Sequence, residues 1–165
     1  MCCIYATNRN PAFDQFFDDL QSKVDPLVPT ILCGDCNAVF DPSADRFGSD
    51  PSDLSHESSS SLQDLFDTYC FVDIWRYLHP SLSSFSWTRW DGTRASRIDL
   101  CGIPYVWVSS VLSFDLLPCP FSDHCGLLTA VSVPDIVPPR PALWKPNTSI
   151  LQEQAYIHLI SDFSA

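Results

Sequence analysis

Three groups of polar residues interrupt apolar stretches of this sequence, and their side chains are of the kinds that can hydrolyse a phosphate ester. The groups are Gly34-Asp35-Cys36-Asn37, Ser96-Arg97-Ile98-Asp99 and Ser122-Asp123-His124. Each lies near the end of a run that predicts a β-strand, where an ionisable group is costly unless it is bonded, binds metal or does chemistry. Together they offer a carboxylate to activate water, an amide to hold an oxygen, a metal carboxylate and an aspartate-oriented imidazole.

Asp35 and Asn37 are two residues apart at a predicted strand end, so both side chains can point to one face. An Asx-turn is an alternative interpretation, because Asp and Asn readily bond their own backbone. A calcium loop is excluded, since its sixth position would be Phe40 rather than glycine. Cys33 and Cys36 have the spacing of a redox pair or half a zinc site, but no second such pair follows. We therefore interpret them as an incidental pair around Asp35.

Asp99 and His124 predict an Asp-His pair in which the carboxylate sets the tautomer of the imidazole. His124 directly follows Asp123 and begins a predicted strand. The other histidines lack such neighbours and are interpreted as surface residues: His56, His79 and His158.

Apolar periodicity predicts an alternation of strands and helices. The expected strands cover residues 2–6, 30–33, 85–90, 93–103, 106–117 and 125–133, with a hairpin turn at Asp91-Gly92. One helix is expected after an Asn10 cap, where Phe13, Phe16, Phe17 and Leu20 recur at helical spacing. Two more are expected over 62–69 and 72–78, and residues 41–61 are expected to form a long surface loop. Residues 1–133 are expected to form one domain, followed by a proline-rich linker over 134–148 and a short amphipathic helix over 149–165.

Composition limits the class of protein. The chain has 165 residues, a net charge of −11 and eight cysteines. The acidic excess argues against a general nucleic-acid binder, although Ser86 to Ile103 is locally basic. No run predicts a membrane span or a signal peptide, so we expect an intracellular protein, nuclear or cytoplasmic, with reduced cysteines.

Five phrases in this order resemble the endonuclease/exonuclease/phosphatase superfamily, and most closely the apurinic-type endonuclease domain of LINE-type (non-LTR) retrotransposons. They are Ile4-Tyr5-Ala6-Thr7-Asn8, Ile31-Leu32-Cys33-Gly34-Asp35-Cys36-Asn37, Phe85-Ser86-Trp87-Thr88, Ser96-Arg97-Ile98-Asp99 and Pro118-Cys119-Pro120-Phe121-Ser122-Asp123-His124. The resemblance implies an α/β fold, here part of a four-layer α/β sandwich with the N-terminal half missing. The missing half would carry the principal metal-binding glutamate, whereas the first glutamate of this chain is Glu57.

The resemblance also implies roles for individual residues. Asp35 would activate or position water, Asn37 would hold a phosphate oxygen, Asp99 would orient His124 at the scissile phosphate, and Asp123 would be a metal carboxylate. Tyr5 would bond the phosphate, unless it is simply a core aromatic residue. The substrate-binding positions would be Ser86, Arg89, Trp90 and Arg97, although the aromatic residues around the hairpin turn would also suit ordinary cross-strand packing.

The implied activity is Mg²⁺-dependent hydrolytic nicking of DNA, weak or absent in this chain. In the parent element, the missing half-domain and a downstream reverse transcriptase would be partners. Two alternatives remain open: a non-catalytic structural or interaction remnant, and an active phosphodiesterase or phosphatase completed by another chain.

Overall fold

The computed structural model describes residues 1–7, 12–48 and 60–132, within one structural unit, Met1–Ser132. The predicted linker, the predicted C-terminal helix and Glu57 lie outside the described residues. None of the helices in the described part of the chain is long and apolar enough to cross a membrane.

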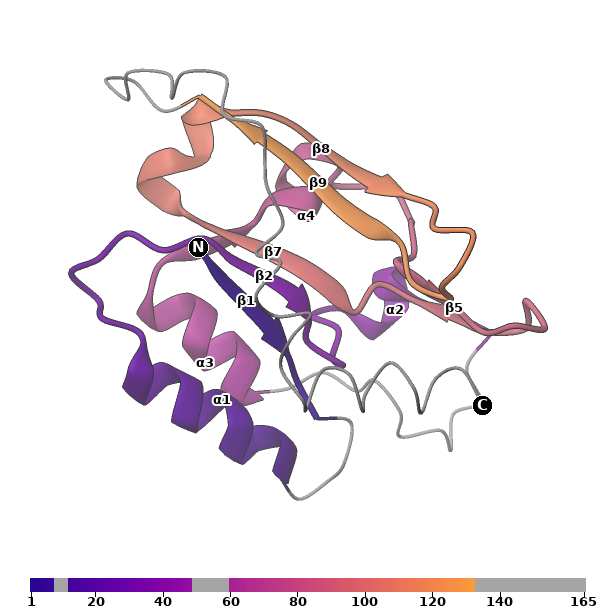
Figure 1. Ribbon diagram of the computed structural model, residues 1–165, viewed down its shortest axis with the longest axis horizontal. Helices are drawn as coiled ribbons and strands as arrows, with labels where there is room; N and C mark the ends of the chain where they lie inside the picture. Colours follow the sequence, from indigo (N-terminus) through magenta and orange to yellow (C-terminus); the bar gives the residue numbers. More distant parts are fainter. Residues whose placement is uncertain (8–11, 49–59, 133–165) are drawn as a thin grey trace, which may run out of the picture. The chain divides into compact units, whose positions relative to one another are not determined.

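The centre of the unit is a mixed four-stranded sheet with the strand order β1-β2-β7-β4 (Figure 1). Strand β1 (Cys2–Tyr5) is parallel to β2 (Leu32–Asp35), which is antiparallel to β7 (Asp99–Pro104), and β7 is antiparallel to β4 (Phe71–Asp73). All six residues of β7 are buried, as expected for a strand with a neighbour on each side. The sheet confirms the mixed α/β class.

Two amphipathic helices cover one face of this sheet (Figure 1). They are α1 (Ala12–Lys23) and α3 (Ser60–Thr68), and both were predicted from their helical periodicity. Their buried side chains pack with the sheet residues Ile4, Leu32 and Leu100 into one core; they are Phe17, Leu62, Leu65 and Phe66. Burial of each such side chain contributes about 1.5–3 kcal/mol.

The opposite face of the sheet is covered by a second core that contains the helix α4 (Ile74–Leu78) and the hairpin of β8 (Val111–Leu117) with β9 (Gly126–Val131). Two predictions need correction here. Residues 72–78 are not all helical, because Phe71–Asp73 pairs with β7 and only the following residues form α4. The expected strand over 106–117 begins as the 3-10 helix η1 (Tyr105–Ser110).

A small three-stranded sheet, β3-β6-β5, adjoins the start of β7. It contains β3 (Arg46–Phe47), β5 (Trp87–Thr88) and β6 (Ala95–Ser96), so the hairpin around Asp91-Gly92 is confirmed. The expected single strand over 93–103 is wrong: its first part pairs with β5 and its last part is β7 in the central sheet. The start of the expected surface loop is also ordered, because Pro42–Asp45 forms the helix α2, capped by Asp41.

Candidate active site

Asp35 ends β2 at a point where three strands meet. It lies opposite Tyr5 on β1 and opposite Asp99 on β7. Gly34, just before it, has a φ of +135°, and a Cβ there would stand 2.1 Å from the backbone oxygen of Ile4. Only glycine permits this close approach of β1 and β2. The local sequence therefore places the Asp35 carboxylate beside both neighbouring strands.

Asn37 holds the Asp35 carboxylate in place. Its backbone N–H donates to Asp35 Oδ1 at 2.8 Å, so the Asx-turn, which was the alternative interpretation, is present. Its side-chain Nδ2 donates to the Ala6 oxygen at 2.6 Å and to Asp35 Oδ2 at 3.3 Å. The φ of Asn37 is 48°, a left-handed conformation that asparagine tolerates better than most residues. In this structure Asn37 positions Asp35, and its amide nitrogen is already engaged by the protein.

Asp99 and His124 form the predicted pair. Asp99 Oδ2 lies 2.9 Å from His124 Nδ1, which directs Nε2 of the ring away from the carboxylate. The backbone of Asp99 is also fixed, because its N–H and that of Ile98 both donate to Ser86 Oγ at 2.9 and 3.1 Å. A carboxylate held in this way can set the tautomer of the imidazole.

Asp123 is tied to the small sheet. Its Oδ2 accepts a hydrogen bond from Trp87 Nε1 at 2.8 Å, and its backbone oxygen accepts from the Thr88 N–H at 3.0 Å. A backbone bridge pairs Trp87 with His124. These contacts hold the segment before β9 against β5, and they place His124 over Asp99.

The charges at this end of the sheet influence one another. Burial raises the pKa of the Asp35 carboxyl above its ordinary value, and the negative charges of Asp99 and Asp123 raise it further. The hydrogen bond from Asn37 and the charge of His124 act in the opposite direction. The structure thus brings Asp35, Asp99 and His124 together at this end of the sheet, around a partly desolvated carboxylate.

Two predicted substrate-binding residues must be corrected, because both are inside the fold. Ser86 has 0% exposure and its hydroxyl accepts the two amide bonds described above, so it positions Asp99 and does not reach a DNA backbone. The Arg97 side chain is 1% exposed and is engaged by Asp45 and Asp73. Asp45 also pairs with Arg76. Sequence reasoning missed this buried cluster and the Trp87–Asp123 bond, since none of these partners is close in the chain.

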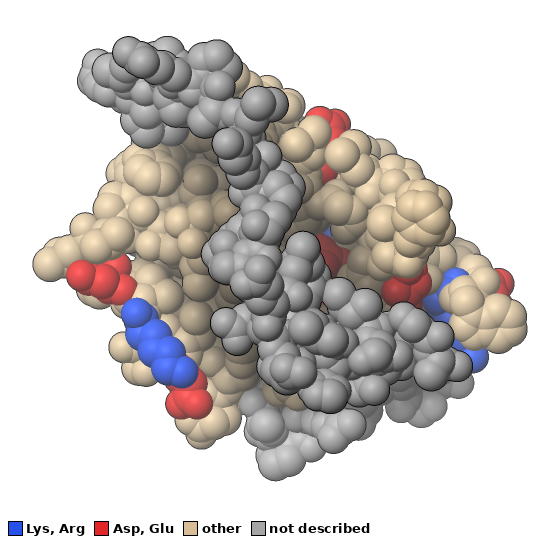
Figure 2. Space-filling view, in the orientation of Figure 1, with Lys and Arg blue, Asp and Glu red and all other residues tan. Residues whose placement is uncertain are grey.

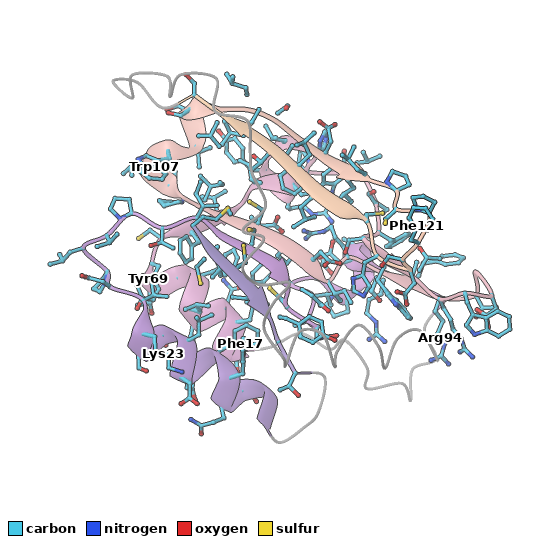
Figure 3. The ribbon with its side chains drawn as sticks, in the orientation of Figure 1. Phe17, Lys23, Tyr69, Arg94, Trp107 and Phe121 are labelled. Carbon is cyan, nitrogen blue, oxygen red and sulfur yellow. The ribbon has the colours of Figure 1, made fainter. Side chains whose placement is uncertain are left out.

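The remaining predicted contacts are on the surface. Tyr5 is 77% exposed beside Asp35, and Trp90 is 88% exposed at the β5–β6 hairpin. Arg89 is partly exposed and pairs with Asp91 at 3.2 Å. Figure 3 shows Arg94 at the right of the view and Lys23 at the left, and Figure 2 shows separate blue areas on these two sides. The hairpin is thus a small cationic and aromatic projection.

The donor set for a metal ion is incomplete in the described part of the chain. Mg²⁺ requires near-octahedral oxygen coordination from well-placed carboxylates and water. The site has three aspartates, Asp35, Asp99 and Asp123. Among the described residues, however, no three possible ligands are grouped so that they could hold one metal ion. Asp123 in addition shares its carboxylate with Trp87. These residues do not by themselves make a Mg²⁺ site.

Comparison with known proteins identifies the fold. No protein-family model and no curated protein matches the sequence. Among solved structures, an AP endonuclease from Archaeoglobus fulgidus is similar at 19% identity and a TM-score of 0.54, covering 73% of this chain and 52% of that one. A 3'-5' exonuclease from Neisseria meningitidis is similar at 17% identity and a TM-score of 0.60, covering 79% and 60%.

A third solved structure, a 3' phosphatase from Neisseria bound to a product DNA hairpin, has 18% identity and a TM-score of 0.62, again covering 79% and 60%. The chain therefore has the α/β fold of the endonuclease/exonuclease/phosphatase type. It spans between about half and three fifths of the length of these three structures.

Proposed function

We propose that this chain is the C-terminal part of a nuclease domain from a LINE-type retrotransposon, and that the ancestral reaction of the domain is Mg²⁺-dependent hydrolytic nicking of DNA. The observation that carries the proposal is the linked set Asp35, Asp99 and His124, with its carboxylate-to-imidazole contact of 2.9 Å. The similar solved structures support the class of reaction, since their names describe DNA-processing enzymes. The share of those structures that this chain spans supports the assignment to one part of a domain.

Each residue of the site is proposed to have a separate role in phosphodiester hydrolysis. The Asp35 carboxylate, with its raised pKa, is suited to accept a proton from the attacking water. His124 presents Nε2 to a phosphate oxygen because Nδ1 is held by Asp99. Tyr5 is exposed and is the register partner of Asp35, and its hydroxyl is proposed to donate to the same phosphate. A divalent cation, when bound, would supply charge stabilisation at the phosphate.

The activity of this chain alone is proposed to be weak or absent. The carboxylates of the site need at least one further ligand to hold Mg²⁺ well, and the resemblance assigns that ligand to a glutamate in the other half of the domain. The acidic net charge of −11 also weakens association with DNA, because phosphate binding depends on cationic contacts. The cationic hairpin with Trp90 is the surface proposed to meet DNA.

A phosphatase or phosphodiesterase completed by another chain is the second candidate. It is supported by the similarity to the Neisseria 3' phosphatase, whose structure contains product DNA. A non-catalytic remnant is the third candidate, and it retains the fold without the reaction.

The test compares the chain alone with a hybrid that adds the N-terminal part of the Archaeoglobus AP endonuclease. Nicking of supercoiled plasmid is measured with Mg²⁺, alongside release of 3' phosphate from an oligonucleotide. We expect the chain alone to be inactive and the hybrid to nick, with loss of nicking in His124→Ala and Asp35→Ala. Asp115→Ala, at an exposed position of β8, is the control and should nick normally.

Each other outcome selects an alternative. Phosphate release without nicking supports the phosphatase. If the hybrid folds and nicks equally well with His124→Ala and Asp35→Ala, the site assignment is wrong and the non-catalytic remnant is supported. Nicking by the unmodified chain that depends on His124 contradicts the proposed inactivity.

A further inference from the structure

Three cysteines lie side by side across the central sheet, at a position that the proposed hydrolysis does not use. Cys3 on β1 is the partner of Cys33 on β2, and Cys33 is the partner of Cys101 on β7. Directly opposed residues of neighbouring strands share one face of a sheet. Here it is the face away from α1 and α3, because Cys33 and Cys101 pack in the second core. Figure 3 shows several sulfur atoms gathered where these strands run together.

Cys3 and Cys33 have the geometry from which a disulfide can form. Their sulfur atoms are already in contact, with Sγ to Sγ at 3.9 Å. Neighbouring strands are about 4.8 Å apart, which is within the Cα separation of about 4.4–6.8 Å that disulfides span. Rotation of the side chains can therefore close the gap without moving β1 or β2 apart.

The three thiols differ in access to solvent. Cys3 is exposed, Cys33 is half-buried and Cys101 is 1% exposed. Burial raises the pKa of Cys33 to about 11, and the neighbouring Cys3 adds to that rise, so Cys33 rests as a thiol. A small reagent thus meets Cys3 first, with Cys33 directly behind it.

We propose that Cys3 and Cys33 are a modification site that forms a reversible disulfide by exchange with low-molecular-weight disulfides of the glutathione type. The Cys3 thiolate attacks the external disulfide, forms a mixed disulfide and releases one thiol. Cys33 then loses its proton and attacks Cys3 Sγ, which releases the second thiol. The two cysteines are oxidised by two electrons, and the external disulfide is reduced to two thiols.

The cross-link would act on the edge of the sheet beside the candidate active site. In the described part of the chain β1 pairs with β2 alone, so β2 is the one strand whose ladder holds it in the sheet. Cys3 and Cys33 are each two residues before Tyr5 and Asp35, and these two are also partners in register. Oxidation therefore fastens β1 to β2 next to the catalytic carboxylate, whichever reaction the domain performs.

The test is disulfide mapping on the full chain, incubated without denaturant in a glutathione/glutathione disulfide buffer and quenched by alkylation. We expect a cross-link between the tryptic peptides 1–9 and 24–46, with fragment ions that assign it to Cys3 rather than Cys2 and to Cys33 rather than Cys36. The product should lack two of the eight alkylated thiols. Reduction with a dithiol should restore both.

Variants and a denatured control make the result decisive. Cys3→Ser should abolish the cross-link, whereas Cys119→Ser, at an exposed cysteine away from the row, should leave its yield unchanged. Protein incubated in urea should give scrambled products instead. The proposal is overturned by a stable glutathione adduct on Cys3 without the cross-link, by a cross-link from Cys33 to Cys101 or Cys2, by unmodified thiols throughout, or by equal yields with and without urea.

Discussion

Asp99 Oδ2 and His124 Nδ1 lie 2.9 Å apart although 25 residues separate them in the chain. Asp99 is the first residue of β7, where the hydroxyl of Ser86 accepts its backbone N–H. His124 reaches it because the segment before β9 is bonded to β5 through Asp123 and Trp87. The pair is therefore built by the junction of the central sheet and the small sheet, and it is the part of the site most open to test.

Replacement of Asp99 by asparagine should lower the catalytic rate without unfolding the protein. The amide can occupy the same space, but it does not hold His124 in one tautomer as a carboxylate does. In the hybrid domain described above, we expect Asp99→Asn to lower kcat by about 10²- to 10⁴-fold. Imidazole nitrogen shifts in NMR spectra should show a mixture of tautomers. Asp115→Asn is the matched control, and an equal loss of nicking there would contradict the assignment.

Removal of the Arg97 guanidinium should destabilise the fold. Arg97 donates to Asp45 at 2.8 Å and to Asp73 at 2.7 Å, and Asp45 is completely buried. Arg97→Met leaves these carboxylates only partly compensated, and breaking a buried pair in this way costs about 3–5 kcal/mol. Urea denaturation should show the loss in the free energy of unfolding.

Lys23→Met on the exposed end of α1 is the control for Arg97, and should change stability by less than about 0.5 kcal/mol. If both variants were equally stable, the buried ion-pair cluster would not have the structural role assigned to it. If Arg97 instead bound DNA, Arg97→Met would weaken DNA binding with little change in the unfolding curve.

Gly34 and Gly92 offer a matched pair for testing the approach of β1 to β2. Both have positive φ, but a Cβ at Gly34 would meet the Ile4 oxygen at 2.1 Å, whereas a Cβ at Gly92 has nothing within 4 Å. Gly92→Ala should cost only the conformational strain of about 1–2 kcal/mol. Gly34→Ala should cost clearly more and should speed hydrogen exchange of the β1 amides. Similar losses for the two variants would rule out the backbone clash as the cause.

Ionisation of Asp35 should make stability depend on pH in a defined direction. Burial raises its pKa in the folded state above the ordinary 3.8, so the folded protein binds the proton more tightly than the unfolded chain. The stability linked to this group is fully present below pH 3.8 and is lost as the pH rises through the folded-state value. Asp35→Asn removes that loss and keeps an oxygen to accept the Asn37 N–H.

We therefore expect Asp35→Asn to be more stable than the original chain at pH 7, with the difference shrinking toward pH 3.8. Chemical denaturation across this range measures it. A variant that is less stable at pH 7 would show that the charged carboxylate stabilises the site.

The sequence by itself determined the local features of this protein. Helical spacing of Phe16, Phe17 and Leu20 predicted α1, because periodicity reports which side of a helix is buried. Asp91-Gly92 predicted the hairpin, since its backbone preferences act within the turn itself. Polar residues at strand ends marked Asp35, Asp99 and His124 as a possible site.

Only the tertiary structure decided which of the marked side chains face solvent. Arg97, in the locally basic stretch, was expected to bind substrate. Its side chain is instead buried and paired with Asp45 and Asp73, which are 52 and 24 residues away in the chain. Ser86 was expected to bind substrate, but it is buried and its hydroxyl accepts the backbone N–H groups of Ile98 and Asp99. The physical reason is that burial and pairing energies depend on groups distant in the chain, which a local pattern of residues does not specify.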